Sequence, residues 1–197
     1  MSYVAIVLAS ASERRSRLLD QIGVAHACVA ADIDESQLPG EAPAAYVQRL
    51  AREKSGAIVA RLAGRADQPV LAADTTVVFD GQVYGKPTDE SDCVAMLSAL
   101  AGRTHEVLTA IALRHGGLLR EALCTSRVTF RAIGTEECRR YWASGEPAGK
   151  AGAYAIQGLG AVFVSRLDGS FSGVMGLPLY ETAALLDAAG VTRWQAR

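Results

Sequence analysis

The sequence has no strong excess of charge of either sign. Its 197 residues include 20 lysines and arginines and 21 aspartates and glutamates, for a formal net charge of −1. A general electrostatic attraction to nucleic acid or to an anionic membrane requires a basic excess, which this chain does not have. We therefore expect neither kind of partner, and any basic binding site must be local.

Long apolar runs are also missing. No stretch approaches the length needed to cross a bilayer, and the first residues do not read as a charged leader followed by an apolar segment. Half of the residues are hydrophobic and 21% are charged, a composition typical of a folded globular protein. We expect an enzyme or binding protein of the cytoplasm.

Cysteine and histidine are few and scattered. The four cysteines never form a CxxC pair, and the three histidines complete no zinc-ligand spacing. Buried, reduced thiols are the simplest interpretation. Lysine is also scarce, because only three of the 20 basic residues are lysines: Lys54, Lys86 and Lys150.

The hydrophobic pattern predicts helices and strands in mixed order. Strands are expected near 3–9, 27–31 and 69–80, then a long hairpin over 104–133 that turns at Gly116-Gly117, and further strands at 161–169 and 170–176. Helices are expected at 13–22, 43–62 and 89–102, from Thr135 onward, and from Pro178 to Gly190. This order predicts an α/β or α+β fold on a mixed sheet, as one compact unit with two lobes and a cleft.

The stretch LASASERRSRLL, residues 8–19, joins the first expected strand to the first helix. Helix N-termini carry partial positive charge and usually begin with acidic residues, yet here Arg14, Arg15 and Arg17 follow one glutamate. Hydroxyls, exposed N–H groups and guanidinium groups together suit a phosphate. The glycines and lysine of a Walker loop are missing. The alternative is an ordinary arginine-rich surface turn.

Two charged residues stand in apolar surroundings. Lys54 lies four residues after Leu50 and four before Ile58, on the apolar stripe of its helix. It either extends to solvent from the edge of the stripe or delivers an ammonium group into a cleft. Asp74 interrupts an apolar strand, so it must be hydrogen-bonded, near a cation or at an exposed strand end. It could cap a turn or assist hydrolysis with a metal ion.

Weaker signals complete a possible nucleotide site. The acidic loop DIDESQLPGE, residues 32–41, could supply a metal-binding oxygen or simply be solvated. Lys86 is fixed between a glycine and a proline. The glycine-rich GKAGAYAIQG, residues 149–158, presents Gln157, whose amide could read a nucleobase edge. Together these residues suit a nucleoside triphosphate with a divalent metal.

The motifs LASASERRSRLL, LAREKS, AADTTVV, GKPTD, GKAGAYAIQG and GLPLYET resemble, in this order, those of the Maf family of nucleoside triphosphate pyrophosphatases. The resemblance spans nearly the whole chain and implies a single Maf-like domain over 1–197. It implies a fold related to the inosine triphosphate pyrophosphatases: a mixed, elongated sheet with flanking helices and two lobes around a central cleft. Family members are often dimeric, so a homodimer is compatible with it.

The resemblance also implies a reaction and its residues. Water attacks the α-phosphorus of a nucleoside triphosphate, and a divalent cation, Mg²⁺ or Mn²⁺, is required. By motif, Asp74 resembles the catalytic proton acceptor. Glu35 and Asp74 together resemble the carboxylates that bind the metal ion in the family. The remaining positions resemble substrate-binding ones: Ser10, Ser12, Arg14, Lys54 and Lys86.

Thr75 and Gln157 resemble the branch of the family that acts on dTTP and UTP, so with Arg14 they form a predicted specificity set. The segment SFSGVMGLP, residues 170–178, departs from the form common in the family. Two alternatives stay open. One is the branch that hydrolyses 7-methyl-GTP. The other is a nucleotide-binding regulator of septum formation without turnover, which the presence of both Asp74 and Glu35 disfavours. The expected role is cleaning of the nucleotide pool or division arrest.

Overall fold

The computed structural model describes residues 5–62 and 68–194. The chain forms two compact units. The first comprises the described residues of Met1–Asp74, Thr109–Cys124 and Gly176–Arg197, and the second comprises Thr75–Leu108 and Thr125–Met175. Each unit is therefore assembled from segments that are distant in the sequence.

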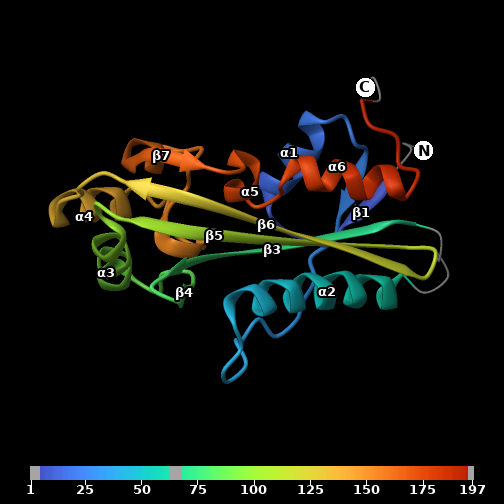
Figure 1. Ribbon diagram of the computed structural model, residues 1–197, viewed down its shortest axis with the longest axis horizontal. Helices are drawn as coiled ribbons and strands as arrows, with labels where there is room; N and C mark the ends of the chain where they lie inside the picture. Colours follow the sequence, from blue (N-terminus) through green and yellow to red (C-terminus); the bar gives the residue numbers. More distant parts are fainter. Residues whose placement is uncertain (1–4, 63–67, 195–197) are drawn as a thin grey trace. The chain divides into compact units, whose positions relative to one another are not determined.

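A seven-stranded mixed sheet runs through the chain (Figure 1). Its order is β2-β1-β3-β5-β6-β7, with β4 paired to β3. β1 is parallel to β2 and β3, whereas β4 is antiparallel to β3 and β7 to β6. The strands are β1 (Ile6–Leu8), β2 (His26–Cys28), β3 (Val70–Phe79), β4 (Gln82–Tyr84), β5 (Thr104–His115), β6 (Leu118–Phe130) and β7 (Val164–Asp168).

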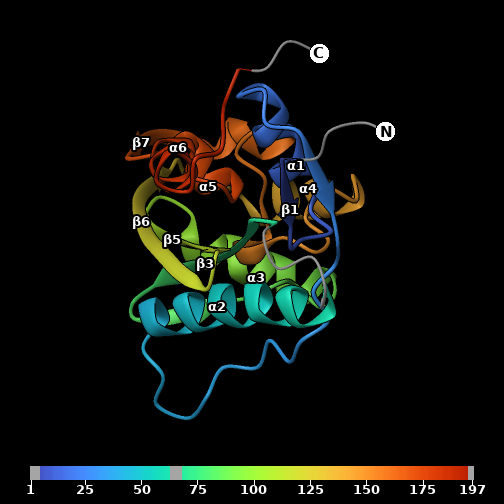
Figure 2. The ribbon, with the colours of Figure 1, turned by 90° about the vertical axis from the view of Figure 1, so that its right-hand side faces the viewer.

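The first unit packs helices on both faces of its strands. α2 (Pro43–Arg61) covers one face, and α1 (Glu13–Gln21) and α6 (Leu179–Ala188) lie on the other (Figures 1 and 2). Pro43 begins α2 in the first turn, where its missing N–H group has no helical partner to lose. Ile58 of α2 packs with Val7 and Val70 in a core of fully buried side chains. This packing fixes the face of α2 that carries Lys54.

The second unit has its own core. α3 (Glu90–Leu100) packs against α4 (Thr135–Ala143), and the remaining helical segments are η1 (Ala151–Ala153), η2 (Leu159–Phe163) and α5 (Phe171–Met175). The Asp89 carboxylate caps α3 by accepting the N–H of Asp92. Its core combines aliphatic and aromatic side chains, with Phe130 and Phe163 among the largest buried groups.

The expected mixed α/β class is confirmed, as are the long hairpin and the five main helices. The first strand covers Ile6–Leu8, and the part of the prediction at positions 3 and 4 lies outside the described residues. None of the described helices is long and apolar enough to cross a membrane.

The prediction of a strand at 170–176 is wrong. Residues 171–175 form α5, because Ser170 acts as a helix cap: its hydroxyl accepts the N–H of Gly173 at 2.9 Å and its carbonyl accepts that of Val174 at 3.0 Å. The backbone N–H of Ser170 in turn donates to the Ser126 hydroxyl at 2.9 Å. The predicted strand at 161–169 begins only at Val164, after η2.

Candidate active site

Polar side chains gather just beyond the carboxyl end of β1, beside the middle of β3. Val7 and Leu8 of β1 pair with Val70 and Leu71 of β3. Ser10 lies two residues beyond this pairing on one chain segment, and Asp74 three residues beyond it on the other. The carboxyl ends of parallel strands are the usual position of ligand sites in α/β proteins. Both residues belong to the first unit.

Lys54 of α2 lies between two carboxylates. Its Nζ is 2.6 Å from Asp74 Oδ1 and 2.6 Å from Glu35 Oε1. The side chain of Lys54 is 9% exposed and that of Asp74 10%, whereas Glu35 is 40% exposed. The apolar stripe therefore does carry the ammonium inward rather than to solvent. Of the three arrangements expected for Asp74, the structure has two, because the nearby ammonium also donates a hydrogen bond to its carboxylate.

Burial and oppositely charged neighbours act in opposite directions on the pKa values of Asp74 and Arg15. Burial raises the pKa of Asp74 above its ordinary value, and the ammonium of Lys54 and the guanidinium of Arg15 offset part of that increase. Burial lowers the pKa of Arg15, which the charge of Asp74 partly restores. A carboxylate with a raised pKa is a better proton acceptor once it is ionised. Perturbed titration beside charged partners is typical of functional sites.

The sequence analysis named Arg15 in the arginine-rich turn but assigned it no role in the site. Its Nη1 donates to Ser10 Oγ at 3.2 Å and its Nε to the Gly176 carbonyl at 2.8 Å. The Ser12 N–H also donates to Ser10 Oγ, at 3.1 Å, so this hydroxyl organises the turn. Ser12 begins α1 without a cap from its own side chain. Arg14 is next to Arg15 and lowers its pKa further.

α2 also holds the acidic loop that carries Glu35. The Tyr46 hydroxyl donates to the Glu35 carbonyl at 2.8 Å, and Arg49 Nη2 to the Ser36 carbonyl at 2.9 Å. Arg49 makes a two-point ion pair with Glu41 at 2.7 and 2.8 Å. This loop is therefore anchored to the helix that bears Lys54 rather than merely solvated.

The carboxylate pair fits a divalent cation that is completed by substrate. Across residues 5–62 and 68–194, no three His, Cys, Asp or Glu side chains gather as a preformed metal site. Mg²⁺ is often bound by one or two carboxylates, with the other ligands from phosphate and water. Asp74 and Glu35 offer that donor set, since Lys54 holds an oxygen of each at 2.6 Å.

Three predicted residues lie in the second unit. Thr75 follows Asp74 on β3, and because successive strand side chains alternate, it points to the opposite face. Lys86 and Gln157 are both exposed. Their two motifs lie side by side, because the Gly152 N–H donates to the Gly85 carbonyl at 3.0 Å. A Cβ atom at Gly152 would lie 2.7 Å from Val77, so this approach requires glycine.

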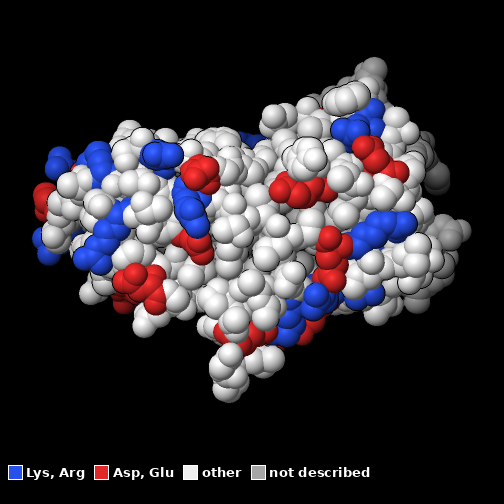
Figure 3. Space-filling model, viewed as in Figure 1, with Lys and Arg blue, Asp and Glu red and all other residues white. Residues whose placement is uncertain are grey.

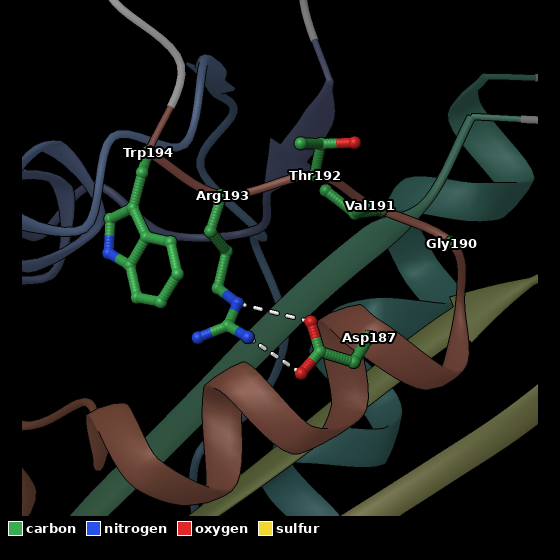
Figure 4. A pocket seen from close by; sticks show the side chains of 6 residues that line it. All are labelled: Asp187, Gly190, Val191, Thr192, Arg193 and Trp194. Atoms are coloured by element: carbon green, nitrogen blue, oxygen red, sulfur yellow. Dashed lines mark hydrogen bonds and ion pairs between the residues drawn. The ribbon is translucent and has the colours of Figure 1, made fainter.

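A separate hollow of about 400 Å³ lies in the first unit, around the turn after α6 (Figure 4). Arg193 is paired there with Asp187 at 2.7 Å and lies over the Trp194 ring, 4.8 Å from its centroid. The lining is Asp187, Gly190, Val191, Thr192, Arg193 and Trp194. None of these six belongs to the predicted site, and the arginine already has a carboxylate partner.

Comparisons with known proteins identify one family and relatives that share one name. A family described as Maf-like protein matches residues 5–189. A protein of Bordetella parapertussis named dTTP/UTP pyrophosphatase is 55% identical over 192 residues, covering 94% of this chain and 93% of the relative. A protein of the same name from Burkholderia pseudomallei is 54% identical over 200 residues, covering 96% of each. The Staphylococcus aureus Ham1 protein is similar at a TM-score of 0.43 and 15% identity, over 64% of this chain and 71% of that one, which supports no inference about activity.

Proposed function

The chain belongs to the Maf-like protein family, and on that premise we propose that it hydrolyses dTTP and UTP to the nucleoside monophosphate and pyrophosphate. Relatives at 54–55% identity over nearly the full length carry that activity in their names. The observation that carries the proposal is the buried pair of Lys54 and Asp74 with the partly exposed Glu35, next to Ser10 and Arg15 on the adjoining turn.

Asp74 acts as the proton acceptor for the attacking water. Burial raises its pKa, and the neighbouring ammonium favours its ionised form, which is the form that accepts a proton. The water attacks the α-phosphorus, the bond from that phosphorus to the bridging oxygen breaks, and pyrophosphate leaves with that oxygen. Lys54 keeps Asp74 oriented and offsets negative charge that develops during the attack.

Ser10, Ser12 and Arg14 bind the phosphates at the turn before α1, and Arg15 fixes the shape of this turn. Lys86 is a further phosphate contact. In this proposal Asp74 and Glu35 hold a Mg²⁺ or Mn²⁺ ion. That ion supplies charge neutralisation on the triphosphate and a more acidic water.

The nucleobase is recognised by a set of three residues: Arg14, Thr75 and Gln157. The exposed amide of Gln157 offers one donor and one acceptor, which matches the O4 and N3–H groups of uracil and thymine. Basic and acidic side chains are interspersed over the face drawn in Figure 3. This mixture suits a small anionic substrate better than a nucleic acid.

In this proposal the whole chain, 1–197, works as one catalytic domain in the cytoplasm, and it removes unwanted pyrimidine nucleotides or contributes to division arrest. A homodimer is compatible with it. No nucleic acid or membrane takes part.

The test is pyrophosphate release from dTTP, UTP, CTP, 7-methyl-GTP and ITP, with Mg²⁺ or Mn²⁺, in water enriched in ¹⁸O. We expect turnover of dTTP and UTP that needs the metal, with the label in the monophosphate and none in pyrophosphate. Preference for 7-methyl-GTP would overturn the substrate assignment and keep the reaction. Nucleotide binding without turnover would replace the enzyme by a regulator, and label in pyrophosphate would refute attack at the α-phosphorus.

A further inference from the structure

The segment that carries Gln157 is fixed at both of its ends. The Ala155 N–H donates to the Tyr141 hydroxyl at 3.1 Å. Beyond the tip, the N–H groups of Leu159 and Gly160 donate to the Glu146 carboxylate, both at 2.9 Å. A short turn closes between these anchors, since the Gly158 N–H donates to the Ala155 carbonyl at 3.2 Å. Gln157 lies exposed in the turn between the two anchors.

Tyr141 and Glu146 are themselves joined. The Tyr141 hydroxyl donates to Glu146 Oε1 at 2.7 Å, and its ring meets Phe163 edge-on with centroids 5.0 Å apart. Burial raises the pKa of Glu146, but the hydrogen bonds from Tyr141, Gly160 and Leu159 outweigh burial and lower it overall. The carboxylate is therefore ionised, and hydrogen bonds to an ionised acceptor are the stronger kind.

The glycines of this segment follow from the same pair. A Cβ atom at Gly158 would overlap the Glu146 carboxylate, and one at Gly160 would lie 2.6 Å from the Tyr141 hydroxyl. A side chain at either position would therefore displace the Glu146 carboxylate or the Tyr141 hydroxyl from the backbone that it contacts. These two glycines are the reason for the pattern GLG directly after Gln157.

We propose that Glu146 and Tyr141 are positioning residues for nucleobase recognition, because they fix the backbone from which Gln157 reads the base. This inference rests on the proposed function. A glutamine amide on a flexible side chain can present its donor and acceptor in either order, so its discrimination depends on a fixed backbone origin. Glu146 and Tyr141 act through Gln157 and need not touch the substrate.

The first test is Glu146→Gln, which keeps the size of the side chain and removes one acceptor. We expect the KM for dTTP to rise about tenfold, the equivalent of one hydrogen bond to a charged group. We expect kcat to stay within about twofold, since these residues are not assigned to the reacting atoms. The matched control is Glu137→Gln, which removes an exposed ion pair with Arg131 in the same unit and should leave both constants unchanged.

The second test is a double-mutant cycle with Gln157→Ala. If Glu146 acts through Gln157, Glu146→Gln adds little to the KM of the Gln157→Ala enzyme. Tyr141→Phe, which leaves the ring in the core, should behave in the same way and serves if Glu146→Gln folds poorly. Faster amide hydrogen exchange at Leu159 and Gly160 in Glu146→Gln would show the freed segment directly.

The possible outcomes separate the two proposals. No dTTP turnover by the wild-type chain refutes the proposed function. The positioning role is refuted if Gln157→Ala raises the KM for dTTP and Glu146→Gln raises it by the same factor in the wild-type and the Gln157→Ala enzymes. An unchanged KM in both Glu146→Gln and Tyr141→Phe refutes it too.

Discussion

At the scale of single residues, the site depends on one ammonium group shared by two carboxylates. Lys54 Nζ contacts Asp74 and Glu35 at 2.6 Å each, while its own side chain is 9% exposed. Removing one member of a buried ion pair leaves the other charge uncompensated, which is far more damaging than losing a surface pair. Lys54 therefore affects both the charge state of Asp74 and the position of the acidic loop.

We predict that Lys54→Met lowers kcat/KM for dTTP about 100-fold or more, a loss typical of removing one buried electrostatic contact. The matched control is Arg52→Met on the same helix, because Arg52 makes an ion pair with Glu121 on the surface, where its side chain is 46% exposed. Steady-state kinetics of both variants provide the check. Equal losses in the two variants would contradict the special role of the buried ammonium.

The pH dependence of Lys54→Met provides a second readout. Asp74 must be ionised to accept a proton, so activity falls as the pH drops through its pKa. Burial raises that pKa and Lys54 lowers it, so removing the ammonium raises it further. We predict that the acid limb of the kcat/KM profile moves to higher pH in Lys54→Met. An acid limb at the same pH in both enzymes would show that the ionisation of Asp74 does not control the activity.

At the scale of helices and strands, the sequence was most informative where a charged residue occupies a position that the hydrophobic pattern predicts to be buried. The helical period placed Lys54 on an apolar stripe, and the apolar strand made Asp74 conspicuous. Both do meet in the structure. Glu35, in contrast, was identified only through the family resemblance, because nothing in an acidic loop distinguishes one carboxylate from its neighbours.

Arg15 could not be separated from Arg14 by sequence. Its distinguishing partner, the Gly176 carbonyl, is 161 residues away in the chain, and local pattern carries no information about such a contact. The strand predicted at 170–176 was wrong for a related reason. Ser170 is held by Ser126, 44 residues away, and only in that position does it cap α5.

We predict that Ser170→Ala lowers the free energy of unfolding by about 1 kcal/mol, the usual effect of losing a helix cap. The hydroxyl of Ser170 accepts the N–H of Gly173, and alanine offers no acceptor there. Ser170→Asn restores an acceptor and should recover most of the loss. Urea denaturation of the three proteins measures this, and equal stability of the alanine variant would refute the capping role.

At the scale of the whole molecule, one buried histidine links stability to pH. His105 is 2% exposed, its Nε2 lies 2.9 Å from the Tyr154 hydroxyl, and its Nδ1 has no hydrogen-bond partner among the residues that the structure describes. Burial lowers its pKa from 6.5 to about 4. The folded protein therefore keeps this ring neutral at a pH where the unfolded chain already binds a proton.

The contribution of His105 to stability is complete above pH 6.5 and is lost as the pH falls toward about 4. At about 1.4 kcal/mol per pKa unit, this shift lowers the free energy of unfolding by about 3 kcal/mol across that pH range. We predict that His105→Gln flattens this part of the curve. Denaturation midpoints of both proteins between pH 4 and 7 supply the measurement, and parallel curves would contradict the assignment.

The central claim is that Asp74, held by Lys54, activates the water that hydrolyses the triphosphate. Its most direct test is the dTTP turnover of Asp74→Asn, with circular dichroism and nucleotide binding measured on the same preparation. We predict that kcat falls about 10²- to 10⁴-fold, as expected for loss of a general base, while the fold and binding are retained. A folded variant that turns over dTTP at close to the wild-type rate would remove Asp74 from the mechanism.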